Sequence, residues 1–102
     1  MKVKNLHGSS ALFGQPTCQC STWIEHWINN KGVKPIFCRC CGKQTTDLVG
    51  GHVIKVSGED KSRYIVPLCR DCNNTNNEAE FDVSESDLVS ANCDKCKNKK
   101  VH

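Results

Sequence analysis

Apolar residues recur at intervals of three and four between positions 22 and 30, the spacing of one face of a helix. The residues on this face are Trp23, Ile24, Trp27 and Ile28. Thr22 and Glu25 are placed to form a capping box, and Gly32 supplies a stop. The pattern predicts a short amphipathic helix over residues 22–30. Its tryptophans are expected in a core rather than stacked on bases, and His26 is expected to pack rather than bind a metal.

Runs rich in β-branched residues follow this helix and predict strands. Residues 33–37 are expected to form a short strand. Residues 45–56 and 62–68 flank a turn-forming run at 57–60, so they predict a β-hairpin. The first strand of the hairpin is broken by Gly50-Gly51.

The two ends of the chain carry weaker patterns. Residues 1–17 are punctuated by Gly, Ser and Pro, which predicts an irregular N-terminal arm. A short helix is expected within residues 73–80, although asparagine is a weak helix former, and a last short strand at 88–91. The predicted organisation is therefore an arm, a single zinc-bound domain over residues 18–96, and a basic tail at 97–102.

Two Cys-x-x-Cys pairs are the clearest chemical signal. They are Cys38 with Cys41, and Cys69 with Cys72. Two intervening residues let a tight turn aim both sulfurs at one ion, and a second pair completes four-coordination. Gly42 follows the first pair, where a knuckle turn often needs a positive φ. The sequence therefore predicts a structural zinc site made by these four thiols.

Four further cysteines lie near the ends of the chain: Cys18, Cys20, Cys93 and Cys96. If the ends pack together, these residues form a second zinc site that closes a loop of nearly the whole chain. The alternative is four free thiols. Cys40 is the remainder of the nine cysteines. His7 and His102 are spare candidate ligands for either site.

Length and composition explain why a metal is expected. A chain of 102 residues with only 6% aromatic residues supports one small domain with a modest core, and metals commonly stabilise domains of this size. No signal sequence or membrane-spanning apolar run is evident. Clustered thiols without an export signal favour zinc binding in reducing cytoplasm over disulfides. We expect a cytoplasmic protein with no membrane partner.

Charge is unevenly distributed along the chain. Each four-thiolate zinc site adds a net −2, so two sites would bring the formal charge of +3 down to −1. Residues 31–70 hold eight Lys or Arg against three acids, and residues 71–94 hold seven acids and no base. The basic region could contact DNA or RNA, with candidate contacts at Lys55, Lys61, Arg63 and Arg70. The acidic region could instead bind a protein partner, and solvated surface charge is the third interpretation.

A knuckle, a hairpin and a helix that begins at the second ligand pair define the treble-clef zinc arrangement. The predicted fold class is therefore α+β. It is a small zinc-stabilised treble clef of zinc knuckle, β-hairpin and short helix, with an added N-terminal amphipathic helix.

The chain resembles the HNH endonuclease (ββα-metal) family in the order knuckle, Gly51-His52-Val53, hairpin, Pro67-Leu68-Cys69-x-x-Cys72-Asn73. More closely, Gly50-Gly51-His52-Val53 and Tyr64-Ile65-Val66-Pro67-Leu68-Cys69 resemble motifs of a family of small uncharacterised bacterial proteins, over nearly the whole chain. The HNH resemblance implies that His52 acts as a general base. It also implies that Asn73 or Asn77 holds Mg²⁺ or another divalent cation at a scissile phosphate.

Three positions depart from the HNH pattern. Gly51 stands where active nucleases carry Asp, Glu or His, and Tyr64 stands where an Asn orients the base. The helix ligand is an amide, which binds Mg²⁺ weakly, and the missing carboxylate would have to come from Asp47 or Asp71. These departures favour a catalytically degenerate nucleic-acid- or protein-binding module. The alternative is an active divalent-metal-dependent HNH endonuclease with His52 as general base.

Overall fold

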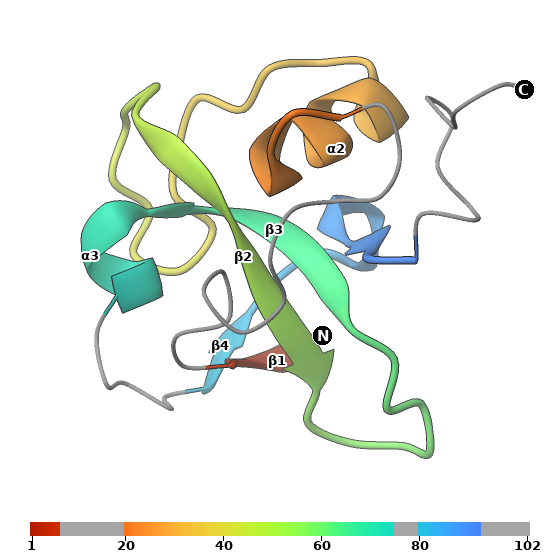
Figure 1. The fold of residues 1–102 in the computed structure, drawn as a ribbon. Helices are drawn as coiled ribbons and strands as arrows, with labels where there is room; N and C mark the ends of the chain where they lie inside the picture. The colour runs from red at the N-terminus through yellow and green to blue at the C-terminus, as the bar shows by residue number, and fades with distance from the viewer. Residues whose placement is uncertain (7–19, 75–79, 93–102) are drawn as a thin grey trace, which may run out of the picture.

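The computed structural model describes residues 1–6, 20–74 and 80–92, and in this part the chain folds around a five-stranded antiparallel sheet (Figure 1). The strands are β1 (Lys2–Asn5), β2 (Leu48–Lys55), β3 (Tyr64–Cys69), β4 (Glu80–Asp82) and β5 (Val89–Ser90), in the order β4-β1-β2-β3-β5. The helices are α2 (Trp23–Lys31), α3 (Arg70–Asn74) and a short 3₁₀ turn, η1 (Glu85–Asp87). The predicted α+β class is confirmed.

The predicted hairpin is the centre of the sheet. Strands β2 and β3 pair from Leu48 opposite Cys69 to Val53 opposite Tyr64. The run at 57–60 turns the chain between them, as its composition predicts. Strand β2 continues through Gly50-Gly51 without a break, so the expected interruption is wrong.

Helix α2 is one residue later at each end than the predicted 22–30, and the predicted cap Thr22 and stop Gly32 flank it. The Glu25 N–H donates to Thr22 Oγ1 over 3.2 Å, while the Glu25 carboxylate accepts from the Ser21 N–H over 3.0 Å. The carboxylate thus reaches one residue further back than a standard capping box requires. Gly32 ends the helix with a left-handed φ of 76°, and its N–H donates to the Ile28 carbonyl.

Helix α2 covers one face of β2 and β3 with the predicted apolar stripe (Figure 1). Trp27 is buried against Ile65 and Val89, and its indole N–H donates to the Asp87 carbonyl over 2.8 Å. His26 is buried, and its Nε2 lies 2.7 Å from the Ser90 carbonyl oxygen. The predicted core role of the tryptophan stripe and the packed role of His26 are confirmed.

Three expectations for the chain ends and connections need correction. Residues 1–17 are expected to be irregular, but Lys2–Asn5 form strand β1 between β2 and β4. Residues 33–37 form no strand and make one isolated bridge, from Phe37 to Gln44. The helix expected within 73–80 begins earlier, at Arg70, and Glu80 already belongs to β4. Residues 75–79 lie outside the described part.

The two consecutive glycines of β2 are required by close packing on opposite faces of the sheet. A Cβ at Gly50 would lie 2.6 Å from the backbone carbonyl carbon of Trp23, so helix α2 could not approach the strand. A Cβ at Gly51 would lie 2.3 Å from Leu68 Cδ1 and 3.1 Å from Asn73 Oδ1. Neighbouring residues of a strand face opposite sides of the sheet. Gly50 therefore leaves room for helix α2 on one face, and Gly51 leaves room for Leu68 on the other.

No helix in the described residues is long and apolar enough to cross a membrane.

The Gly51–Leu68 contact predicts non-additive mutational effects. Gly51→Ala should lower the free energy of unfolding by about 1–3 kcal/mol through overpacking, and Leu68→Ala by about 2–5 kcal/mol through a cavity. Leu68→Ala removes the methyl group that clashes with the new Cβ. The double variant should therefore lose at least about 1 kcal/mol less stability than the two single variants lose when added together. Urea denaturation of the four proteins measures this difference. Gly51→Ala combined with Val89→Ala, on the other face, is the additive control, and additivity of the Leu68 pair would contradict the packing described here.

Candidate metal centre

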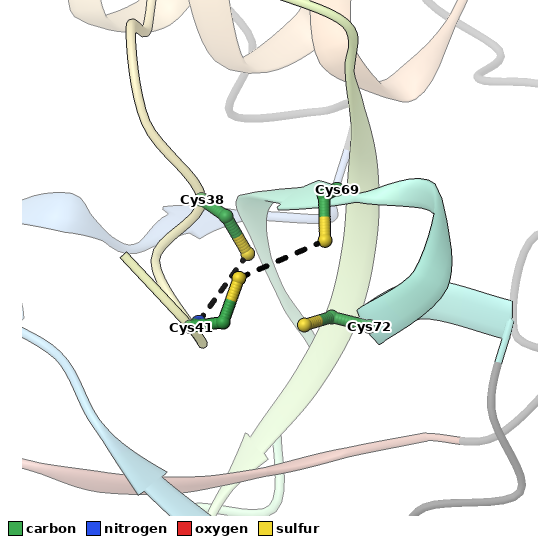
Figure 2. Close-up of side chains that lie close together, drawn as sticks. All are labelled: Cys38, Cys41, Cys69 and Cys72. Atoms are coloured by element: carbon green, nitrogen blue, oxygen red, sulfur yellow. Dashed lines mark hydrogen bonds between the residues drawn. The ribbon is translucent and has the colours of Figure 1, made fainter. Parts of the chain in front are cut away.

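The four cysteines of the two Cys-x-x-Cys pairs lie together (Figure 2). Cys38 and Cys41 come from the loop between α2 and β2, Cys69 is the last residue of β3, and Cys72 lies in α3. Their sulfur atoms all lie within 4.8 Å of one another and point towards a common centre. This convergence is what the sequence predicts for one metal site.

Local backbone geometry aims each pair. Gly42 has a φ of 77°, as expected for the knuckle, and its N–H donates to the Cys38 carbonyl over 2.9 Å. The N–H groups of Cys40 and Cys41 lie 3.4 and 3.5 Å from Cys38 Sγ and donate to it. The Arg39 N–H donates to the Pro67 carbonyl over 2.9 Å. That last bond holds the first pair beside the end of β3, where the second pair begins.

The separation of the sulfur atoms is compatible with a metal ion such as zinc. With zinc–sulfur bonds of about 2.3 Å, the sulfurs of a regular tetrahedron are about 3.8 Å apart. Cys41 Sγ and Cys69 Sγ are 3.8 Å apart. This one separation has the tetrahedral value, and the four thiols together lie close enough to hold a metal ion.

The electrostatics of the cluster also favour a bound cation. Burial raises the pKa of Cys38, but N–H donation from Cys41, Cys69 and Cys40 outweighs this and lowers the pKa to about 7. Burial raises the pKa of Cys69 and, more strongly, that of Cys72, where neighbouring thiols add to the shift. Four thiolates this close are unfavourable alone, and a divalent cation compensates their charge.

One residue next to the cysteine cluster, Asn5, could not be predicted from the sequence. Asn5, buried on β1, donates from Nδ2 to the Cys72 carbonyl over 3.1 Å. It thereby connects the N-terminal strand to the turn that carries the fourth thiol. The motif gives no signal for this contact, because Asn5 is 67 residues from Cys72 and its strand has only one apolar residue.

The other thiols are only partly described. Cys40 is half-buried, and burial raises the pKa of its thiol. Cys20 is buried, and Asn29 Nδ2 donates to its sulfur over 3.3 Å. Cys18, Cys93 and Cys96 lie outside the described residues, as do His7 and His102. The second zinc site therefore stays a prediction.

Among the described residues, the two candidate catalytic residues His52 and Asn73 lie on opposite faces of the sheet. His52 is 1% exposed and packs edge-on against Trp23 of α2, with ring centroids 4.8 Å apart. Asn73 is 6% exposed and lies against Gly51, on the opposite face of the sheet. Asp47 pairs with Arg70 instead, at 3.2 Å, and Asp71 is exposed. Asn77 lies outside the described residues.

Some of the candidate nucleic-acid contacts have acidic partners within the chain. Lys55 Nζ lies 3.2 Å from Asp60 and 5.0 Å from the centroid of the Tyr64 ring. Arg70 forms the pair with Asp47. Lys61 is exposed. These intramolecular pairs reduce the positive charge that this surface offers to phosphates.

Comparison with known proteins gives no match, either to a protein-family model, to a curated protein or to a solved structure. The resemblances drawn from the motifs therefore remain predictions.

Burial of His52 predicts a pH dependence of stability. Burial, followed by the charges of Arg63 and His26, lowers the pKa of His52 to about 4. Between the ordinary value of 6.5 and this value, the unfolded chain binds a proton that the folded chain does not. Folding therefore loses stability as the pH falls through this window. From pH 7.5 to pH 5 the loss from this residue should be about 2 kcal/mol.

The measurement is the free energy of unfolding of the wild type and of His52→Phe at several pH values. Protonation of the thiols affects both proteins alike. The difference between their free energies of unfolding therefore reports the contribution of His52 alone. The wild type should lose more stability than the variant as the pH falls. Parallel pH profiles would contradict this account, because they would show that His52 has the same pKa in the folded and the unfolded chain.

Proposed function

We propose that this chain is a zinc-binding treble-clef domain of HNH-like lineage whose metal is structural, and that it acts as a binding module rather than as an enzyme. The observation that carries the proposal is the set of four converging thiols of Cys38, Cys41, Cys69 and Cys72. Zinc is the metal that an all-cysteine tetrahedral set favours, and four protein ligands leave no open position for a substrate or a water.

The arrangement of elements around the thiols supports the treble-clef assignment. The first pair lies in a knuckle closed by the Phe37–Gln44 bridge. The β2–β3 hairpin follows, and α3 begins at Arg70, between the two cysteines of the second pair. This is the order knuckle, hairpin and helix that the motif spacing predicts.

The placement of His52 supports a binding role over catalysis. A general base must reach a water near the scissile bond, yet His52 is covered by α2 and separated by the sheet from Asn73. Burial also keeps the imidazole of His52 neutral near pH 7, as a general base must be. The buried ring, however, cannot reach a water or a substrate from which to take a proton.

Adjacent cysteines provide a matched test of the zinc site. Cys41→Ser should lose the metal and unfold at lower temperature, because a structural zinc contributes directly to folding. Cys40→Ser, at the neighbouring position, should retain as much zinc as the wild type. Elemental analysis of the purified proteins gives zinc per chain, and thermal denaturation gives stability.

Equal zinc content in Cys41→Ser and the wild type would contradict the assignment of ligands. The wild-type value also decides between one and two sites, since a second site adds one more zinc per chain. Cys20→Ser distinguishes these cases, because it should lower the zinc content only if the second site exists.

The proposal predicts no nuclease activity. Plasmid incubated with the full chain and Mg²⁺, Mn²⁺ or Ni²⁺ should be cut no faster than with His52→Ala, since His52 is covered. Gel electrophoresis of the plasmid reports both nicking and linearisation. Cleavage that disappears in His52→Ala would establish the alternative, an active HNH endonuclease.

A further inference from the structure

The loop between helix α2 and strand β2 exposes apolar side chains next to the metal centre. We call residues 33–44 the knuckle loop. Within it, Val33 is 61% exposed, Ile36 57% and Phe37 41%. Three large apolar side chains exposed within five residues are unusual in a chain with a small core, and such exposure commonly marks an interaction site.

The backbone that carries these side chains is fixed rather than free. The Thr45 N–H donates to the Ile36 carbonyl over 3.0 Å, and the Cys38 N–H donates to the Lys43 carbonyl over 2.9 Å. The Phe37–Gln44 bridge lies between these bonds. Cys38 and Cys41 lie within the loop, so a metal bound by the cysteine cluster would hold the loop in shape. A preformed surface loses little conformational entropy when a partner binds.

Every charged residue in the knuckle loop and at the end of helix α2 is basic. Residues 31–44 contain four bases and no acid: Lys31, Lys34, Arg39 and Lys43. Lys34 and Lys43 are exposed. Arg39 is engaged within the fold, because its Nε lies 3.4 Å from Asp87 Oδ1 and its guanidinium lies 4.0 Å from the centroid of the Phe37 ring.

We propose that the knuckle loop is a docking surface for a protein partner, and that the partner binds through a peptide segment that combines acidic and apolar side chains. The apolar residues Val33, Ile36 and Phe37 would contact the apolar side chains of the segment. Lys34 and Lys43 would pair with its acids at the rim, the usual division of an interface into apolar centre and charged edge. The proposal rests on the proposed function, since the zinc site shapes the loop.

The same residues fit a single-stranded nucleic acid less well. Nucleic-acid platforms stack bases on aromatic rings, whereas Val33 and Ile36 are aliphatic. The ring of Phe37 already lies against the Arg39 guanidinium. The cations suit either anionic partner, but the exposed aliphatic side chains suit a protein.

The test selects ligands from a phage-displayed library of random twelve-residue peptides, using the zinc-loaded full chain as bait. Selected sequences should be enriched in Asp and Glu alternating with Leu, Ile or Phe. A synthetic, fluorescein-labelled copy of the most enriched peptide is then titrated by fluorescence anisotropy. A labelled twelve-residue oligothymidylate is titrated in parallel as the nucleic-acid probe.

Matched variants separate the loop from the rest of the surface. Val33→Ser with Ile36→Ser should weaken peptide binding at least tenfold, a typical effect of removing interface anchors. Val56→Ser, which alters another exposed apolar residue at 37% exposure, should not. Lys34→Glu with Lys43→Glu should also weaken binding at least tenfold, whereas Lys61→Glu, at an exposed site in the β2–β3 connection, should not.

The outcomes are distinguishable. Failure of any peptide to enrich, or equal binding by the wild type and the Val33/Ile36 variant, would overturn the docking proposal. The proposal would also be overturned if the oligothymidylate bound more tightly than the peptide and the Lys34/Lys43 variant lost this binding. That result would assign the loop to nucleic acid. Zinc content is measured in every protein. A chain without zinc refutes the proposed function, whereas a zinc-loaded chain that binds no peptide refutes only the inference.

Discussion

Four thiols within 4.8 Å of one another join the loop before β2 to the end of the central hairpin. In a chain this small the apolar core is limited, and the loop that carries Cys38 and Cys41 has little regular structure of its own. A cation at the centre would convert an unfavourable cluster of thiolates into a cross-link between this loop and the end of the central hairpin. The bond from the Arg39 N–H to Pro67 supports the same junction, but one hydrogen bond contributes far less than a structural zinc.

The cross-link reaches beyond its own ligands. Asn5 connects Cys72 to strand β1, which in turn holds β4 at the edge of the sheet. Arg39 lies between the two cysteines of the first pair and contacts both Asp87 and Phe37. The cysteine cluster is therefore connected to the N-terminal strand, to the segment before β5 and to the exposed knuckle loop. In the proposed function, a metal with no open coordination position would act by shaping the surface that a partner contacts.

Sequence reasoning succeeded where the signal is local. Cys-x-x-Cys spacing, the Thr22 cap and the β-branched runs of the hairpin each report on neighbouring residues, so they predict the thiol cluster, α2 and β2–β3. It failed where contacts between residues far apart in the sequence determine the local structure. Strand β1 has one apolar residue, Val3, and forms because β2 and β4 supply its hydrogen bonds. Gly50-Gly51 look like a strand break, yet they are needed because α2 and Leu68 approach from opposite sides. The burial of His52 follows from the same docking of α2, which no motif records.

The most direct test of this account is a crystal structure of the purified full chain with anomalous diffraction recorded on both sides of the zinc absorption edge. The account predicts a zinc peak about 2.3 Å from each of the sulfurs of Cys38, Cys41, Cys69 and Cys72, in tetrahedral geometry. No peak at that position, or disulfide bonds joining these cysteines in place of a metal, would contradict it.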